Sequence, residues 1–237
     1  TDPRIVPKAR RLDRVSYEEM LEMASLGAKV LQVRSVELAM VRGVRTFVRS
    51  SFVAPDAPEL LAGGDPPGTL ICDEDEIVEK KVVSGIAYSK DEAQLSLRHV
   101  ADKPGIAAAV FGPLAAANIN VDMIVQNVSE DGTTTDMTFT VPTADYERAR
   151  KVLEEARDSI GYTRLQGSTD VAKISVIGIG MRSHAGVAAD CFQALAAKGI
   201  NIRAITTSEI KISVLIDAPY TELAVRTLHS LYGLDNS

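Results

Sequence analysis

The sequence predicts an α+β protein that repeats one βαββα unit, because residues 93–127 read as a strand, a loop with a glycine, a helix and a second strand, and the same pattern returns downstream. Before the helix, the spacing between copies is 79 residues (Leu95 and Ile174); after the loop it is 81, because the second loop is two residues longer. Loops absorb such insertions. The landmarks that recur at the spacing of 81 are Gly105 and Gly186, Val110 and Cys191, Phe111 and Phe192, Leu114 and Leu195, and Asn120 and Asn201.

The remaining elements follow in the same order in both copies. The first copy continues with a strand at Thr135–Val141 and an amphipathic helix at Asp145–Arg157, then adds a last strand near residues 162–166. The second continues with a strand at Ser208–Ile216 and a helix at Tyr220–Leu231. This order predicts two ferredoxin-like βαββαβ units.

The second copy lacks a last strand after its helix, since residues 233–237 are short and polar. Residues 82–89, VVSGIAYS, form a strand pattern with no obvious partner in sequence. We predict that this strand completes the second sheet, because a vacant edge would invite aggregation.

The first 53 residues predict a smaller group of elements. Ser16 and Glu19 form a capping box at the start of a helix that reaches about Leu26 and ends at Gly27. A second helix is expected from Lys29 to about Val41, followed by a strand across residues 44–49. Residues 54–69, rich in Pro and Gly, predict a linker, and residues 73–79 an acidic, solvated stretch.

The composition excludes several classes of protein. The formal net charge of −6 argues against binding nucleic acid, and no apolar run or leader suggests a membrane span or a signal peptide. The two cysteines, Cys72 and Cys191, cannot form a disulfide framework, which favours a reducing, cytoplasmic compartment. His99, His184 and His229 lie far apart, so we expect no metal site. The first residue is not Met, which indicates a fragment or a partly observed protein.

A binding site for a free amino acid is one interpretation of the first repeat. The turn Asp102–Gly105 precedes a helix whose free amides and positive dipole end attract an anion such as an α-carboxylate. We expect the strand that begins at Asn120 to emerge beside this loop, so that backbone carbonyls and Asp122 receive the α-ammonium, while Gln126 contacts the ligand side chain. On residue types alone, the alternative stays open that Asp102 caps the helix and Asn120 shapes a turn.

The second repeat is not expected to form an identical pocket. Asp122 is replaced by Arg203, which reverses the charge where an ammonium would bind. A composite pocket, formed by the first repeat and second-repeat residues of a partner chain, is therefore favoured. The run Gly178-Ile-Gly180-Met-Arg-Ser183 resembles the start of a dinucleotide fingerprint but lacks its third glycine, so we expect no nucleotide there. Ser183 and His184 are interpreted as a polar loop.

Several motifs resemble one known family. The duplicated unit with Asp-Lys-Pro-Gly at 102–105, Asn-Val-Asp-Met-Ile-Val-Gln-Asn at 120–127 and Thr-Ser-Glu-Ile at 207–210 is similar to the tandem ACT domains of aspartate kinase of the lysine- and threonine-inhibited type. The runs TDPRIVP and SYEEMLEMASLGAKVL resemble the C-terminal end of the α/β amino-acid-kinase domain. The resemblance implies a kinase remnant at 1–53, a linker at 54–80, a strand for the second ACT unit at 81–92, and ACT units at 93–169 and 170–237.

The resemblance also implies site residues. No catalytic residue and no metal ligand is expected within these residues, which alone would be inactive. Contacts to ATP would come from Thr1, Asp2, Pro3, Arg4 and Lys29. Effector contacts would come from Asp102, Lys103, Pro104, Gly105, Ile106, Ala107, Asn120, Val121, Asp122, Gln126, Val187, Ala188, Asn201, Ile202, Ser208 and Glu209.

By this resemblance the whole enzyme would use ATP and Mg²⁺ to phosphorylate L-aspartate on the route to lysine, threonine and methionine, and this chain would bind threonine or lysine as a feedback sensor, with no tightly bound cofactor. A homodimer or higher oligomer through the ACT units is expected. Two alternatives stay open. The first is a separate non-catalytic regulatory subunit or stand-alone amino-acid sensor, with a second aspartate kinase subunit as a partner. The second is a structural oligomerisation unit that binds no ligand.

Overall fold

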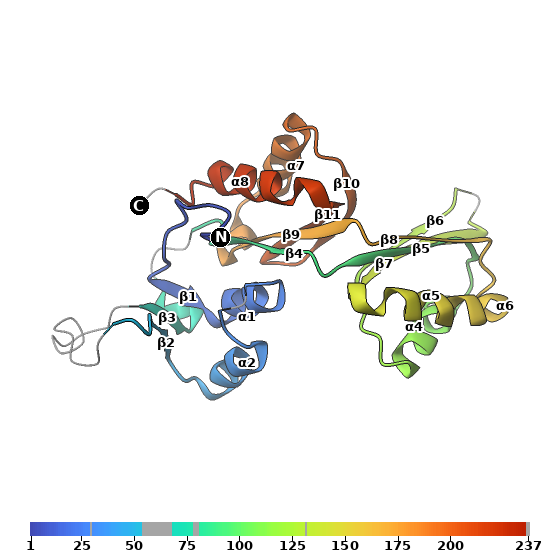
Figure 1. Ribbon diagram of the computed structural model, residues 1–237, viewed down its shortest axis with the longest axis horizontal. Coiled ribbons are helices and arrows are strands. Elements are labelled where there is room, and N and C mark those ends of the chain that lie inside the picture. The colour runs from blue at the N-terminus through green and yellow to red at the C-terminus, as the bar shows by residue number, and fades with distance from the viewer. Residues whose placement is uncertain (29, 54–67, 78–80, 131, 236–237) are drawn as a thin grey trace.

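The computed structural model describes residues 1–28, 30–53, 68–77, 81–130 and 132–235 (Figure 1). In these ranges the strands form three sheets. One lies in the N-terminal part, and one lies in each of the two ferredoxin-like units, here called the first plait (residues 93–168) and the second plait (residues 85–89 and 171–231). The two plaits confirm the predicted α+β class and the duplicated ferredoxin-like unit.

The first plait is a four-stranded antiparallel sheet in the order β6-β7-β5-β8, covered on one face by helices. Its core packs Val110 and Leu114 of the helix stripe against Leu95 and Phe139 of the sheet, all fully buried. The predicted final helix is split in two. The elements are β5 (Ala93–Ala101), α4 (Ile106–Ala116), β6 (Asp122–Val128), β7 (Thr134–Val141), α5 (Tyr146–Glu155), α6 (Arg157–Ile160) and β8 (Arg164–Ser168).

The second plait has the same strand order, β10-β11-β9-β4. β4 pairs antiparallel with β9, Gly85 opposite Ile177, and lies where β8 lies in the first plait. It is shorter than the expected 82–89, and the strand expected from Ser208 begins only at Lys211 because residues 208–210 form the turn. The elements are β4 (Gly85–Ser89), β9 (Val171–Ile177), α7 (Val187–Ala197), β10 (Ile202–Thr207), β11 (Lys211–Asp217) and α8 (Thr221–Leu231).

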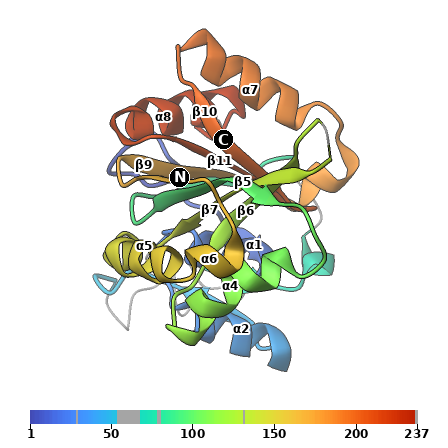
Figure 2. The same ribbon diagram turned by 90° about the vertical axis from the view of Figure 1, so that its right-hand side faces the viewer.

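A two-stranded ribbon joins the plaits. β4 continues into β5 and β8 continues into β9, so both chain segments pass from one sheet to the other (Figures 1 and 2). Between the sheets, Met123 of β6 packs with Val171 of β9, Ala204 of β10 and Leu215 of β11. The plaits therefore share a small apolar interface as well as the ribbon.

The duplication extends to a polar detail. Ser96 and Thr138 lie opposite each other on β5 and β7, with their hydroxyl oxygens 2.8 Å apart. Ser175 and Ser213 do the same on β9 and β11 at 2.7 Å. Each pair satisfies two hydroxyls inside a sheet, where an unpaired polar group is costly.

The N-terminal part is a three-stranded sheet, β1-β3-β2, beside two helices. The predicted capping box is present, with the Glu19 amide 3.1 Å from Ser16 Oγ and the Ser16 amide 3.3 Å from Glu19 Oε2. The central strand β3 was not predicted, because its four residues stand alone next to a Pro- and Gly-rich stretch. The elements are β1 (Arg14–Ser16), α1 (Tyr17–Ser25), α2 (Val33–Arg42), β2 (Thr46–Val48) and β3 (Thr69–Cys72).

The second helix does not begin at the predicted position, since α2 starts at Val33. Gly27 adopts a φ of +111°, and a Cβ there would stand 2.2 Å from the Tyr88 carbonyl oxygen. The chain therefore turns close against β4 before α2 can start, which explains the later start. Lys29 itself lies outside the described residues.

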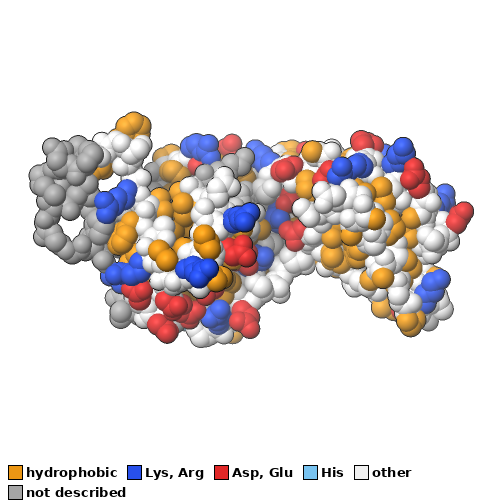
Figure 3. All heavy atoms as spheres, turned by 90° about the horizontal axis from the view of Figure 1, so that it is seen from below, with side chains coloured by type: hydrophobic (Ala, Val, Ile, Leu, Met, Phe, Trp, Pro, Cys, Tyr) orange, Lys and Arg blue, Asp and Glu red, His pale blue; other side chains and the backbone are white. Residues whose placement is uncertain are grey.

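The view from below shows hydrophobic side chains over the N-terminal part and over the first plait (Figure 3). On α2, Leu38 and Val41 are 59% and 70% exposed, which is typical of a surface that packs against further protein. Within the described ranges, no helix is long and apolar enough to cross a membrane, and no group of three or more His, Cys, Asp or Glu residues is placed to hold a metal ion.

Candidate functional site

The loop Asp102–Gly105 leads into an open helix end. α4 begins after Gly105, whose φ is +90°, and no side chain caps it. The loop is exposed, and a Cβ added at Gly105 would meet nothing within 4 Å. The capping alternative for Asp102 is therefore wrong, and the helix N-terminus is accessible to an anion. Ile106 is 4% exposed and points into the core, so only its backbone could contact a ligand.

The strand start Asn120–Asp122 lies at the other end of the sheet, which contradicts the predicted cradle. Ala101, at the end of β5, pairs with Thr134, whereas Asp122 pairs with Thr140. These partners are six positions apart on β7, about 20 Å at roughly 3.4 Å per residue. One chain therefore cannot hold one amino acid between the loop and the strand start.

The reason is the direction of the crossover. α4 starts at the end of β5 and carries the chain back, so β6 can begin only where α4 ends. Gln126 pairs with Met137, which lies midway along β7 between the partners of Ala101 and Asp122. The structure thus separates Asp102–Ala107 from Asn120, Val121 and Asp122, with Gln126 about halfway between the two ends.

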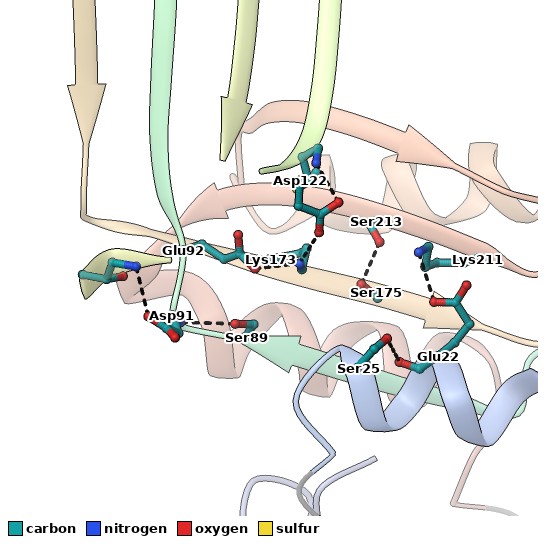
Figure 4. Close-up of polar contacts among 12 residues, drawn as sticks. Glu22, Ser25, Ser89, Asp91, Glu92, Asp122, Lys173, Ser175, Lys211 and Ser213 are labelled. Atoms are coloured by element: carbon teal, nitrogen blue, oxygen red, sulfur yellow. Dashed lines mark hydrogen bonds and ion pairs between the residues drawn. The ribbon is translucent and has the colours of Figure 1, made fainter. Parts of the chain in front are cut away.

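The Asp122 carboxylate forms an ion pair with a lysine of the second plait. Its Oδ2 lies 2.6 Å from Lys173 Nζ of β9, and its Oδ1 accepts the Met123 amide at 2.7 Å (Figure 4). Lys173 Nζ also lies 2.6 Å from Glu92 Oε1. The Lys173 and Glu92 side chains are 7% and 8% exposed, while that of Asp122 is 60% exposed. The contact is an ion triad at the junction between the plaits.

The triad shifts the protonation equilibria of two groups. Burial raises the pKa of Asp122, but the hydrogen bond and charge of Lys173 outweigh this, so the pKa lies below its usual 3.8. Burial likewise lowers the pKa of Lys173, but hydrogen bonds and charges from Asp122 and Glu92 raise it overall above 10.5. All contacts of Lys173 therefore favour its charged form.

The structure explains why the first repeat has Asp122 where the second repeat has Arg203. Arg203 lies at the corresponding position of β10 and donates to Gln94 of β5 at 3.3 Å and to Asp217 of β11. Gln94 is the repeat counterpart of Lys173, 79 residues earlier. In both plaits the start of the second strand thus contacts the first strand of the other plait. Sequence reasoning missed Lys173 and Glu92; the available signal was a lysine inside the apolar strand VAKISVI.

The candidate residues of the second plait divide in the same way. α7 begins after Gly186 at φ +101°, with Val187 buried and Ala188 half-buried. The exposed Ser208 and Glu209 lie at the same end, and Glu209 Oε2 is 3.4 Å from Arg182 Nε. Asn201 and Ile202 lie at the opposite end, where β10 starts.

The glycines of the dinucleotide-like run have a packing role. A Cβ at Gly178 would stand 2.3 Å from the Val82 carbonyl oxygen, and one at Gly180 would stand 2.4 Å from the Lys81 carbonyl oxygen. The segment before β4 therefore lies directly against these glycines. This close backbone approach explains both residues without a nucleotide.

Thr1–Arg4 form a loop on the surface of the second plait. The Arg4 amide donates to Asp2 Oδ1 at 2.9 Å, and the Arg4 guanidinium lies 2.8 Å from Asp2 Oδ2. The Arg4 side chain is 83% exposed and Pro3 is exposed. The loop thus presents the Arg4 guanidinium to solvent, while the Asp2 carboxylate that pairs with it is mostly covered.

Comparisons with known proteins point to one family. Residues 1–50 match the amino acid kinase family, and residues 94–158 and 174–232 each match the ACT domain. A protein named aspartate kinase from Pseudomonas putida is 53% identical over 236 residues, which cover 99% of this chain and 54% of the relative. The chain spans about half the length of the curated relatives it matches.

Two solved structures are also similar. The ligand-free regulatory subunit of aspartate kinase from Thermus thermophilus is 42% identical with a TM-score of 0.60, and the match covers 64% of this chain and 99% of that one. Aspartokinase III from E. coli, in complex with lysine and aspartate in the T-state, is 28% identical with a TM-score of 0.73, and the match covers 97% of this chain and 48% of that one.

Proposed function

This chain belongs to the aspartokinase family, and from that membership we propose that it is part of an aspartate kinase. The whole enzyme would transfer the γ-phosphoryl group of ATP, with Mg²⁺, to the side-chain carboxylate of L-aspartate, yielding 4-phospho-L-aspartate and ADP, the first step toward lysine, threonine and methionine. Such a transfer depends on positioning and charge neutralisation. The chain carries only the end of the kinase part, so we expect these residues alone to be inactive.

The chain's own role in this proposal is feedback sensing of lysine, threonine or both. The observation that supports it most directly is the open start of α4 at Gly105, where exposed amides can bind an α-carboxylate. The similar E. coli enzyme is described with bound lysine, which favours an amino acid as the ligand class. Binding would favour an inactive arrangement of the kinase domain through different affinities for two states.

We propose that two chains build the pocket. Within one chain the loop end and the strand-start end of a plait are about 20 Å apart along the sheet. A second copy in the opposite orientation would bring its strand-start end or its second plait to the loop. The exposed edge strand β6, with Ile124 48% and Val128 57% exposed, offers a surface for such pairing in a homodimer or larger oligomer.

The pocket residues remain those proposed from the sequence, with roles refined by position. Residues at the loop ends would bind the carboxylate and the ligand side chain, and residues at the strand starts would receive the ammonium. The loop-end set is Asp102, Lys103, Pro104, Gly105, Ile106, Ala107, Val187, Ala188, Ser208 and Glu209, the strand-start set is Asn120, Val121, Asp122, Asn201 and Ile202, and Gln126 lies between the two ends.

We also propose that Thr1, Asp2, Pro3, Arg4 and Lys29 contact ATP. The exposed guanidinium of Arg4 has the chemistry to neutralise phosphate, and the turn around Asp2 keeps it at the surface. Mg²⁺ would bind with the phosphates outside the described residues. The proposed division is a kinase remnant at 1–53, a linker at 54–80 from which β3 joins the N-terminal sheet, a strand for the second ACT unit at 81–92, and ACT units at 93–169 and 170–237. Both cysteines are free and buried, which fits a cytoplasmic protein.

A separate regulatory subunit is the second candidate, because the Thermus thermophilus regulatory subunit is matched over nearly its whole length. Assay of aspartyl phosphate formation by the complete gene product distinguishes the two, since only the enzyme forms this product. Calorimetry of the chain with lysine and with threonine tests the sensing role. Saturable binding heat that is weakened by Asp122→Ala supports the sensing role. If neither amino acid produces heat, the result supports a structural role in oligomerisation instead.

A further inference from the structure

The proposed nucleotide loop is packed onto the second plait. Ile5 and Val6, which follow the loop, are each 8% exposed and belong to the core of that plait. The same core contains Val225 and Leu228 of α8. The segment that carries Asp2–Arg4 is thus anchored in the regulatory unit.

Polar contacts hold the loop on both sides. After it, Arg226 Nε of α8 donates to the Ile5 carbonyl oxygen at 3.1 Å. At its first residue, His229 Nδ1 of α8 lies 2.8 Å from Thr1 Oγ1, and the His229 side chain is buried. Glu222, one turn before Arg226, lies 3.0 Å from its guanidinium and orients it. The flanks of the loop are fixed while Pro3 and Arg4 remain exposed.

We propose that α8 positions this loop for the nucleotide, with Arg226 as the main positioning residue and His229 as the second. The inference rests on the proposed contact between Thr1–Arg4 and ATP. A loop fixed before the ligand arrives loses less conformational entropy on binding, so its ligand binds more tightly. Arg226 acts through the Ile5 carbonyl and does not need to touch ATP.

The equivalent helix of the first plait provides a matched control. Arg150 of α5 pairs with Glu147 and Glu154 of its own helix, at 3.8 and 3.1 Å. Arg150→Ala therefore removes a similar exposed helix pair at a position away from the loop. Any general effect of losing a helical arginine should appear in this variant as well.

The experiment uses the complete enzyme and measures steady-state kinetics with each substrate varied. Arg226→Ala is expected to raise the KM for ATP by about 3-fold to 10-fold, because it removes one charged donor to a loop carbonyl that is partly exposed to solvent. The kcat and the KM for aspartate should change less than about 2-fold. Arg226→Lys should recover part of the loss, and Arg150→Ala should behave as the unmodified enzyme.

A second variant tests the same contact in case Arg226→Ala does not fold. Glu222→Gln leaves the donor in place but loosens its orientation, so a smaller rise in the KM for ATP is expected. An unchanged KM for ATP in both variants overturns the inference, and so does an equal rise in the KM for both substrates. If the unmodified complete protein forms no aspartyl phosphate, the proposed function fails instead.

Discussion

Lys173 Nζ lies 2.6 Å from Asp122 Oδ2, and the two residues belong to different plaits. Glu92, in the ribbon between the plaits, holds the same ammonium group at 2.6 Å. An effector ammonium that approached Asp122 would meet a carboxylate already paired with a lysine. Under the proposed function, binding there must share or displace Lys173, and it would thereby alter the junction between the plaits.

Lys173→Met is expected to destabilise the chain by about 3–5 kcal/mol, because it leaves the buried Glu92 carboxylate without its cation. Urea unfolding measures the change. The control is Lys151→Met, which removes an exposed partner of Glu155 and should cost less than about 1 kcal/mol. Equal effects of the two substitutions would show that the triad does not contribute specifically.

The pH dependence of stability follows from the same triad. The lowered pKa of Asp122 stabilises the folded state above 3.8, and this contribution is lost as pH falls through the lowered value. The raised pKa of Lys173 stabilises it below 10.5, and this contribution is lost as pH rises through the raised value. The stability difference between the unmodified chain and Lys173→Met should shrink in acid, as the carboxylates that face Lys173 become protonated. A difference that grows in acid contradicts this assignment.

The sequence predicted local structure and the repeat well, because a helix stripe such as Val110 and Leu114 and a capping box such as Ser16 and Glu19 are encoded within a few residues. It failed where the outcome depends on chain direction. Gly105 and Asp122 are close in sequence, but α4 separates them by its own length. The lysine that pairs with Asp122 comes from 51 residues further on, and although its place in an apolar strand marks it as unusual, nothing in the sequence names Asp122 as its partner.

Glu19 links the kinase remnant to the second plait. Besides the cap, its Oε1 accepts the Ile179 amide at 2.9 Å and the Ser84 hydroxyl. Glu19→Ala should cost about 2–4 kcal/mol, because it removes the Glu19 half of the capping box and leaves the buried Ile179 amide unsatisfied. Hydrogen exchange should speed up at the Ile179 amide. Glu18→Ala is the control, since Glu18 Oε2 has no hydrogen-bond partner within the described residues, and it should leave that amide protected.

Two glycine substitutions should differ in their effect on stability. Gly178→Ala places a Cβ 2.3 Å from the Val82 carbonyl oxygen and should destabilise the chain by about 1–3 kcal/mol. Gly112→Ala, inside α4 with open space around it, gains helix propensity but places a Cβ directly before Pro113, so the two effects should offset and the stability should change by less than about 0.5 kcal/mol. Thermal unfolding of both variants measures the two shifts. If Gly178→Ala is neutral, residues 81–83 do not pack as closely as described.

Gly105→Ala tests the anion site directly. Its φ of +90° and the open space around it mean that alanine strains the backbone without a clash, and the helix entrance should move away from its left-handed turn. We expect lysine or threonine to bind about 5-fold to 30-fold more weakly, which corresponds to about 1–2 kcal/mol. Gly161→Ala is the matched control, because Gly161 also has a positive φ (+77°) and open surroundings but lies outside the proposed pocket. Calorimetry on both variants separates the two effects. Strain alone would weaken binding equally in both, whereas an anion site at α4 would be impaired only in Gly105→Ala.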